Sequence, residues 1–207
     1  MTLRDFHRAS AFVIVAFAAM HIANHLASLL GVSTHIAFME TARTVYRHWA
    51  IESVLLFCVA FQVASGLWFV IRGWRQRKGL IPWLQAGSGA YLAFFLLIHV
   101  GAVLFGRSVL QLDTNFYYAA AGLHVPPNQL FFAPYYFLAV TALFTHLGCA
   151  AYWQLQTASD STRAFVVGGA MVAGGAIALL IVLSLAGKLQ PVEIPANYKA
   201  TYANQDG

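Results

Sequence analysis

The sequence predicts an all-α integral membrane protein: a bundle of five transmembrane helices with a cytoplasmic amino terminus and a carboxy terminus outside. Hydrophobic residues make up 60% of the 207 residues and charged residues only 9%, whereas a soluble domain carries about 25% charged residues. Five segments each supply the roughly 20 apolar residues that a helix needs to cross a bilayer. The placement of Lys and Arg in the connections then sets the orientation.

The five apolar segments are separated by more polar connections. They run from about Ser10 to Leu30, Trp49 to Ile71, Trp83 to Phe105, Leu130 to Trp153 and Arg163 to Ala186. The first segment lacks the pattern of a cleaved signal peptide, so we expect it to stay in the membrane. The spanning domain is expected to cover residues 1–187, with a short polar tail over residues 188–207.

The connection between the second and third segments has the densest group of basic residues, Arg72, Arg75, Arg77 and Lys78. Basic connections stay in the cytoplasm. This side, which also has the amino terminus, is therefore expected to face the cytoplasm of a bacterial-type inner membrane. We attribute the net charge of +5 to basic connections that orient the protein in membrane lipid. No nucleic-acid partner is expected.

The later part of the sequence predicts one connection that lies in the membrane interface and one helix that packs closely against another. The connection between the third and fourth segments is rich in aromatic residues, which favours a segment lying in the membrane interface. The fifth segment contains Gly168-Gly169 and Gly174-Gly175, small residues that let helices approach closely. Cys58 and Cys149 lie inside apolar segments, so neither a disulfide framework nor a cysteine metal site is expected.

Histidines inside the apolar segments are the main functional signal. His21, His99 and His146 lie well within them, where an ionisable group costs about 2–3 kcal/mol and usually marks function. Neutral imidazole is the usual axial ligand of b-type haem iron. The first and third segments run in the same direction, so His21 or His25 can meet His99 at similar depth. This arrangement predicts one haem b between His99 and one of these two histidines.

His146 has a different expected partner. The second segment, which faces it in the predicted bundle, offers Gln62 and no histidine. Gln62 can hydrogen-bond His146 directly or through water, but it is a poor haem ligand. A second haem with two histidine ligands is therefore not predicted. A five-coordinate haem on His146 and a haem-free polar pair both remain open, and the pair is favoured.

Basic residues near the segment ends suggest where the haem carboxylates would lie. Arg8 follows His7, and Arg47 belongs to a group with Arg43 and His48. Guanidinium groups bind carboxylates through paired hydrogen bonds. Arg8 and Arg47 are therefore candidates to neutralise haem propionates.

With these residues in place, the chain resembles the five-helix, di-haem cytochrome b subunit that anchors succinate dehydrogenases and fumarate reductases in the membrane. The resemblance extends from about His7 to Trp153. It is carried by His7-Arg8-Ala9-Ser10 with Met20-His21, Tyr46-Arg47 with Glu52, Gln62 and Gly66, Leu84 to Gly89 with His99, and Phe116 through Pro134-Tyr135-Tyr136-Phe137 with His146. The chain departs from the family where Gln62 replaces a haem histidine and where Ala86 replaces a frequent basic residue.

The resemblance implies a site and a role. His21 and His99 would hold the haem nearer the outer surface, and the inner haem site would retain only His146, opposite Gln62. The chain would be a non-catalytic electron-transfer subunit of an oxidoreductase, exchanging electrons between haem b and quinone. Iron–sulfur and flavoprotein subunits would bind on the cytoplasmic face. The missing ligand implies either a mono-haem variant with altered electron transfer or a scaffold that has left the succinate dehydrogenase role.

Two other classes of function stay open. In a haem-free membrane protein, the buried histidines and Gln62 would line a cavity for a small ligand, a metal ion or a proton. In a structural role, the glycine-rich fifth segment would pack against another membrane protein.

Overall fold

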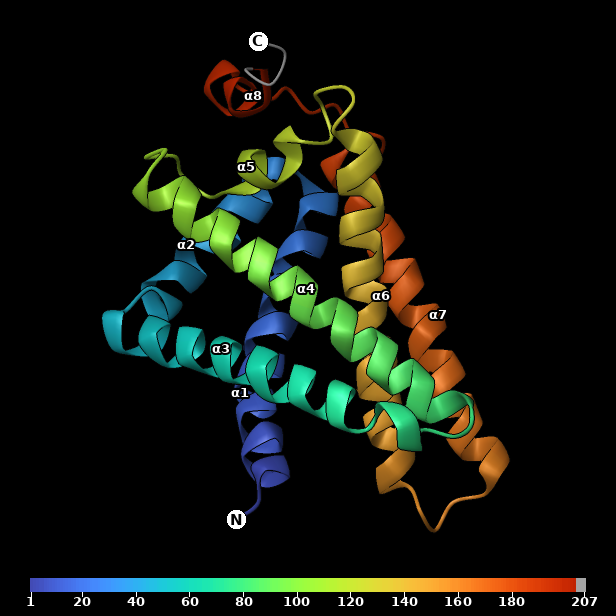
Figure 1. Cartoon of the computed structure of the whole chain (residues 1–207). Coiled ribbons are helices and arrows are strands. Elements are labelled where there is room, and N and C mark those ends of the chain that lie inside the picture. Colours follow the sequence, from blue (N-terminus) through green and yellow to red (C-terminus); the bar gives the residue numbers. More distant parts are fainter. Residues whose placement is uncertain (204–207) are drawn as a thin grey trace.

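The computed structural model describes residues 1–203, and these residues form helices and connections with no strand (Figure 1). Five helices are long and apolar enough to cross a membrane, which confirms the predicted spans. They are α1 (Leu3–Ala27), extended by the short helix η1 (Ser28–Leu30), α3 (Trp49–Arg72), α4 (Leu80–Ser108), α6 (Gln129–Gln154) and α7 (Asp160–Leu185).

The first helix begins at Leu3, earlier than the apolar segment predicted from about Ser10. Thr2 caps it: the Thr2 side chain accepts a hydrogen bond from the Asp5 backbone N–H, and the Asp5 carboxylate accepts one from the Thr2 N–H. This reciprocal pair of hydrogen bonds is a capping box, which stabilises a helix start. The polar residues before Ser10 therefore continue the helix beyond its apolar part.

The connection between the first two spans contains a helix that hydropathy does not predict. This helix, α2 (Val32–Tyr46), follows Gly31, whose φ of 132° lies in a region that favours glycine and turns the chain back. It packs against α1. His35 and Met39 on one face of α2 are 2% and 4% exposed, so α2 forms one wall of the bundle interior.

Helices α6 and α7 lie side by side along their length (Figure 1). Glycines allow this: a Cβ on Gly148 would lie 2.8 Å from the Ala170 Cβ, and one on Gly174 would lie 2.5 Å from the Phe144 Cβ. The predicted packing face of the fifth segment is thus confirmed at Gly174. Gly168, Gly169 and Gly175 instead meet open space.

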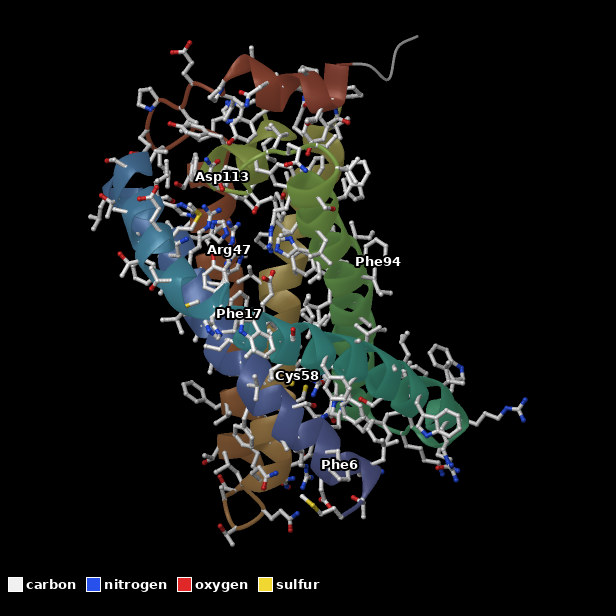
Figure 2. All side chains as sticks on the ribbon, turned by 90° about the vertical axis from the view of Figure 1, so that its left-hand side faces the viewer. Phe6, Phe17, Arg47, Cys58, Phe94 and Asp113 are labelled. Atoms are coloured by element: carbon white, nitrogen blue, oxygen red, sulfur yellow. The ribbon has the colours of Figure 1, made fainter. Side chains whose placement is uncertain are left out.

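Helix α3 crosses α1 steeply in both views (Figures 1 and 2), where a simple bundle would place it antiparallel to α1. It contacts both α1 and α4. A partly buried salt bridge between Glu52 and Arg107 ties its start to the end of α4. The tilt of α3 decides which neighbours its polar side chains reach.

Two short helices, α5 (Phe116–Ala121) and α8 (Ala196–Ala203), cover one end of the bundle, which we call the α5 end (Figure 1). The main core cluster lies here and includes Phe116, Leu185, Ile194 and Tyr198. Ile194 and Tyr198, which follow residue 187, thus pack into the fold. The first and last long helices also meet near this end, where the Ser28 and Ser184 hydroxyl oxygens are 2.7 Å apart and the Gln190 side chain donates to the Ser28 carbonyl.

Candidate functional site

A cavity of about 180 Å³ lies toward the α5 end, between α1, α2, α4 and α6. Residues of α5 and α8 complete its wall, including Tyr118 and Tyr202. Most of the lining is aromatic or aliphatic, and four histidines supply much of its polar surface: His21, His25, His35 and His99. An apolar cavity with a few convergent polar groups is the usual form of a ligand or cofactor site.

The four imidazoles follow one another across the cavity. The ring centres of His99 and His21 are 6.0 Å apart, those of His21 and His25 are 4.7 Å apart, and those of His25 and His35 are 5.1 Å apart. His21 and His25 share one face of α1 because they are four residues apart. The structure therefore brings together the three histidines that the sequence singled out for a haem site.

His21 and His99 are held by stacking and not by hydrogen bonds. Phe17 stacks on His21 at 5.8 Å between ring centres, and Phe95 stacks on His99 at 4.8 Å. Within residues 1–203, neither imidazole makes a side-chain hydrogen bond. Their ring nitrogens are therefore free to bind a ligand or a metal.

His35 is a cavity residue that the sequence pattern did not single out. Its Nε2 lies 3.2 Å from the Asn24 side-chain nitrogen. Burial lowers the pKa of His35 to about 4, and the neighbouring His21 and Arg43 contribute to the shift, so His35 is neutral at pH 7. The signal that could have revealed it is the spacing of His35, Met39 and Ala42, which places all three on one face of a helix after Gly31.

Several buried polar atoms beside this cavity have no hydrogen-bond partner among the described residues. They are the Asn24 side-chain oxygen, Nδ1 of His25 and Nδ1 of His35. Each such atom costs about 1–3 kcal/mol if it stays unpaired. A bound ligand or water that reaches these atoms would therefore be stabilised by them.

Basic residues gather next to the cavity at the α5 end, where Figure 2 shows Arg47 and Asp113. Arg43 forms a 2.7 Å salt bridge to Asp113, but its Nε and second terminal nitrogen are buried and have no hydrogen-bond partner among the described residues. Arg47 donates to the Thr114 hydroxyl at 3.0 Å and has no carboxylate partner within residues 1–203. Burial lowers the pKa of Arg47, and the charges of Arg43 and Arg107 lower it further. An anion here would relieve this repulsion.

Arg8 is not part of this group. It is exposed near the start of α1, and the amino terminus lies at the end of the bundle away from α5 (Figure 1). Of the two arginines proposed to neutralise haem propionates, the structure places only Arg47 beside the cavity, through its contact with the cavity residue Thr114.

Gln62 and His146 lie apart from the cavity and do not form the predicted direct hydrogen bond. The Gln62 amide donates to the Ser10 hydroxyl at 2.8 Å and to the His7 carbonyl. Nδ1 of His146 is 3.1 Å from the Gln85 carbonyl oxygen and 3.2 Å from the Ser88 hydroxyl. The steep crossing of α3 brings Gln62 against α1, while His146 packs on α4. The direct hydrogen bond, which a regular bundle would favour, is thus absent from the described residues, and the contact through water stays a prediction.

The alternative of a bare metal ion can be judged from the side-chain geometry. Residues 1–203 contain no group of three or more His, Cys, Asp or Glu side chains placed to hold one ion. A haem needs only two protein ligands because the porphyrin supplies the other four. The histidine pair therefore fits a haem better than an ion held by protein ligands alone.

The chain was compared with models of known protein families, with curated proteins and with solved structures, and it matches none of them. The chemistry of the cavity is therefore the basis for assigning a function.

Proposed function

We propose that this chain is a membrane b-type cytochrome that holds one haem b between His21 and His99 and exchanges electrons between that haem and a quinone. The observation that carries the proposal is the 6.0 Å separation of these two imidazole ring centres in one cavity. Two metal–imidazole bonds of about 2 Å, with about 1 Å more from each nitrogen to its ring centre, require about 6 Å.

The chemistry of the lining around the histidine pair also suits a haem, but the cavity of about 180 Å³ is smaller than the roughly 300–1,000 Å³ of pockets for drug-sized ligands, so its walls would separate to admit the macrocycle. The macrocycle is apolar and aromatic, like most of the cavity lining. Its two propionates are carboxylates, and the unpartnered nitrogens of Arg43 and the uncompensated charge of Arg47 favour such groups. When bound, haem b supplies one-electron chemistry, while the protein supplies ligands and low polarity.

The geometry favours His21 over His25 as the ligand from α1. His21 approaches His99, whereas His25 contacts His35 on α2. His25 would then border the haem without binding its iron.

One haem is proposed instead of two, because Gln62, the side chain expected opposite His146, is a poor haem ligand and is engaged by α1. A single haem corresponds to the mono-haem variant implied by the resemblance to the di-haem succinate dehydrogenase and fumarate reductase anchors. We propose that the chain serves as an electron-transfer subunit with the basic α3–α4 connection in the cytoplasm, where iron–sulfur and flavoprotein subunits would bind.

The test is a pyridine haemochrome assay with a reduced-minus-oxidised spectrum on the purified chain. We expect one low-spin haem b per chain. His21→Ala and His99→Ala should each abolish the low-spin spectrum, while His146→Ala and the exposed control His48→Ala should leave it unchanged. A wild-type chain that folds in haem-producing cells without haem would refute the proposal, and two haems per chain would refute the single site.

A haem-free ligand-binding role has one observation in its favour. The unpartnered atoms of Asn24, His25 and His35 offer hydrogen bonds to a small polar ligand, whether or not His21 and His99 hold iron. That role predicts a colourless protein whose thermal stability falls when His35 is replaced. Haem content thus separates the two roles.

A further inference from the structure

The connection between α3 and α4 has polar side chains that the proposed cytochrome role does not use. It contains the short helix η2 (Trp74–Gln76) and lies at the periphery of the bundle (Figure 1). A surface hollow is formed there by Ile71, Arg72, Trp74, Arg75 and Gln76. We call it the η2 hollow.

The backbone around the η2 hollow is held in place by a neighbouring arginine. Arg77 donates hydrogen bonds of 2.8 Å to the carbonyl oxygens of Phe69 and Val70 at the end of α3. The guanidinium of Arg77 also lies 5.8 Å from the ring centre of Trp83, and Trp74 packs edge-on against that same ring at 4.8 Å. Arg77 and Trp83 therefore fix the position of Trp74 in the wall of the hollow.

The four polar side chains of the hollow, by contrast, make no side-chain hydrogen bond or salt bridge to any residue in the described range 1–203. They are Arg72, Trp74, Arg75 and Gln76. The Arg72 guanidinium lies over the face of Trp68, at 5.7 Å from the ring centre. Guanidinium and indole groups donate hydrogen bonds and do not accept them. The hollow therefore offers two positive charges and several donors to an anion with several acceptor oxygens, and a phosphate is such an anion.

Apolar groups beside these donors indicate that the anion is part of an amphiphile. Ile71 in the hollow is 72% exposed, and Leu80 at the start of α4 is 71% exposed. Trp74 is 57% exposed and presents an apolar ring with a polar N–H, a combination that suits the boundary between lipid and water. A water-soluble acidic protein would match the charges but not the exposed isoleucine and leucine next to them.

We infer that the η2 hollow binds the phosphate of an anionic phospholipid, with Arg72 and Arg75 on the phosphate oxygens and the acyl chains along Ile71 and Leu80. Basic pockets at the ends of spanning helices are a recurring form of lipid site. This inference does not depend on haem binding at the opposite end of the bundle.

The test is native mass spectrometry of the detergent-purified full chain titrated with phosphatidylglycerol. We expect Arg72→Gln/Arg75→Gln to weaken phosphatidylglycerol binding by about fivefold for each guanidinium removed. The matched control is Arg4→Gln/Arg8→Gln, which removes two exposed charges from the amino-terminal end and should leave the affinity unchanged. Trp74→Phe keeps the ring, removes the indole N–H and should weaken binding by a smaller factor. The melting temperature of each variant, measured without lipid, shows that it is folded.

Two further ligands distinguish the source of the phosphate. Zwitterionic phosphatidylcholine should bind more weakly than phosphatidylglycerol, and millimolar inorganic phosphate should not displace the lipid. Equal binding of the two lipids, equal losses in the control variant, or full displacement by inorganic phosphate would each overturn the inference. So would an Arg72/Arg75 variant that keeps phosphatidylglycerol but loses a soluble acidic subunit, because the hollow would then be a protein-docking surface.

Discussion

The contact between α6 and α7 allows a stability prediction that compares two neighbouring glycines. In Gly174→Ala, the new Cβ would lie 2.5 Å from the Phe144 Cβ and 3.0 Å from its Cγ, whereas carbon atoms in contact prefer about 3.5–4.0 Å. The helices must separate by about 1 Å, and such overpacking typically costs about 1–3 kcal/mol. In Gly175→Ala, the new Cβ meets nothing within 4 Å.

The control substitution isolates the packing contribution. Replacing glycine by alanine inside a helix stabilises it by about 0.5–1 kcal/mol, and this gain applies to both positions. The two variants should therefore differ by the overpacking cost of about 1–3 kcal/mol. For a chain of this length, each kcal/mol corresponds to about 2–4 °C in melting temperature.

The assay is thermal unfolding of both variants and wild type in the same detergent, followed by helical circular dichroism. We expect Gly174→Ala to melt several degrees below Gly175→Ala, which should melt at or above the wild-type temperature. Equal melting temperatures for the two variants would show that α6 and α7 do not pack closely at Gly174, and the argument for their close approach would fail.

Three other predictions concern polar contacts. Glu52→Gln should lower the melting temperature by the equivalent of about 0.2–1 kcal/mol, and exchanging Glu52 and Arg107 for each other should restore part of the loss in a double-mutant thermal series. Ser184→Ala should cost about 0.6–1.7 kcal/mol because it leaves the buried Ser28 without this partner; the Ser28→Ala/Ser184→Ala double variant should lose less than the sum of the single losses, and strict additivity would contradict the contact. Burial, with a contribution from a neighbouring tyrosine, raises the pKa of Tyr202 to about 12, so the folded chain keeps a proton that the unfolded chain releases near pH 10. Stability should therefore fall as the pH rises from 10 to 12, and Tyr202→Phe should flatten that decline in denaturation curves measured at each pH.

The sequence predicted the five long helices because the signal for a spanning helix is local. Each apolar run contains its own evidence of length and hydropathy, and no knowledge of neighbours is needed. Helix α2 was not predicted because Thr34, Glu40 and Thr41 make it too polar for a hydropathy window. Its amphipathic face, which begins at His35, becomes informative only when Gly31 is recognised as the turn between two helices.

The contacts of the candidate site that depend on the depth of a residue in its helix were predicted. The contacts that depend on helix tilt were missed. His21 and His99 could be matched because both lie at similar depths in helices running the same way. The partners of Gln62 and His146 could not be predicted, because helix tilt is set by packing against neighbours and not by apolar length. The steep crossing of α3 sends Gln62 to α1 and leaves His146 to α4.

The contact between Ser28 and Ser184 has a consequence for biogenesis. These residues lie on the first and last long helices, and the cavity near them also requires Tyr202 of α8. During synthesis, α1 enters the membrane long before these late residues leave the ribosome. The cavity wall therefore stays incomplete until translation is nearly finished. A cofactor or ligand held there is enclosed only at the end of synthesis, and chains that stop before Tyr202 would leave the cavity open on that side.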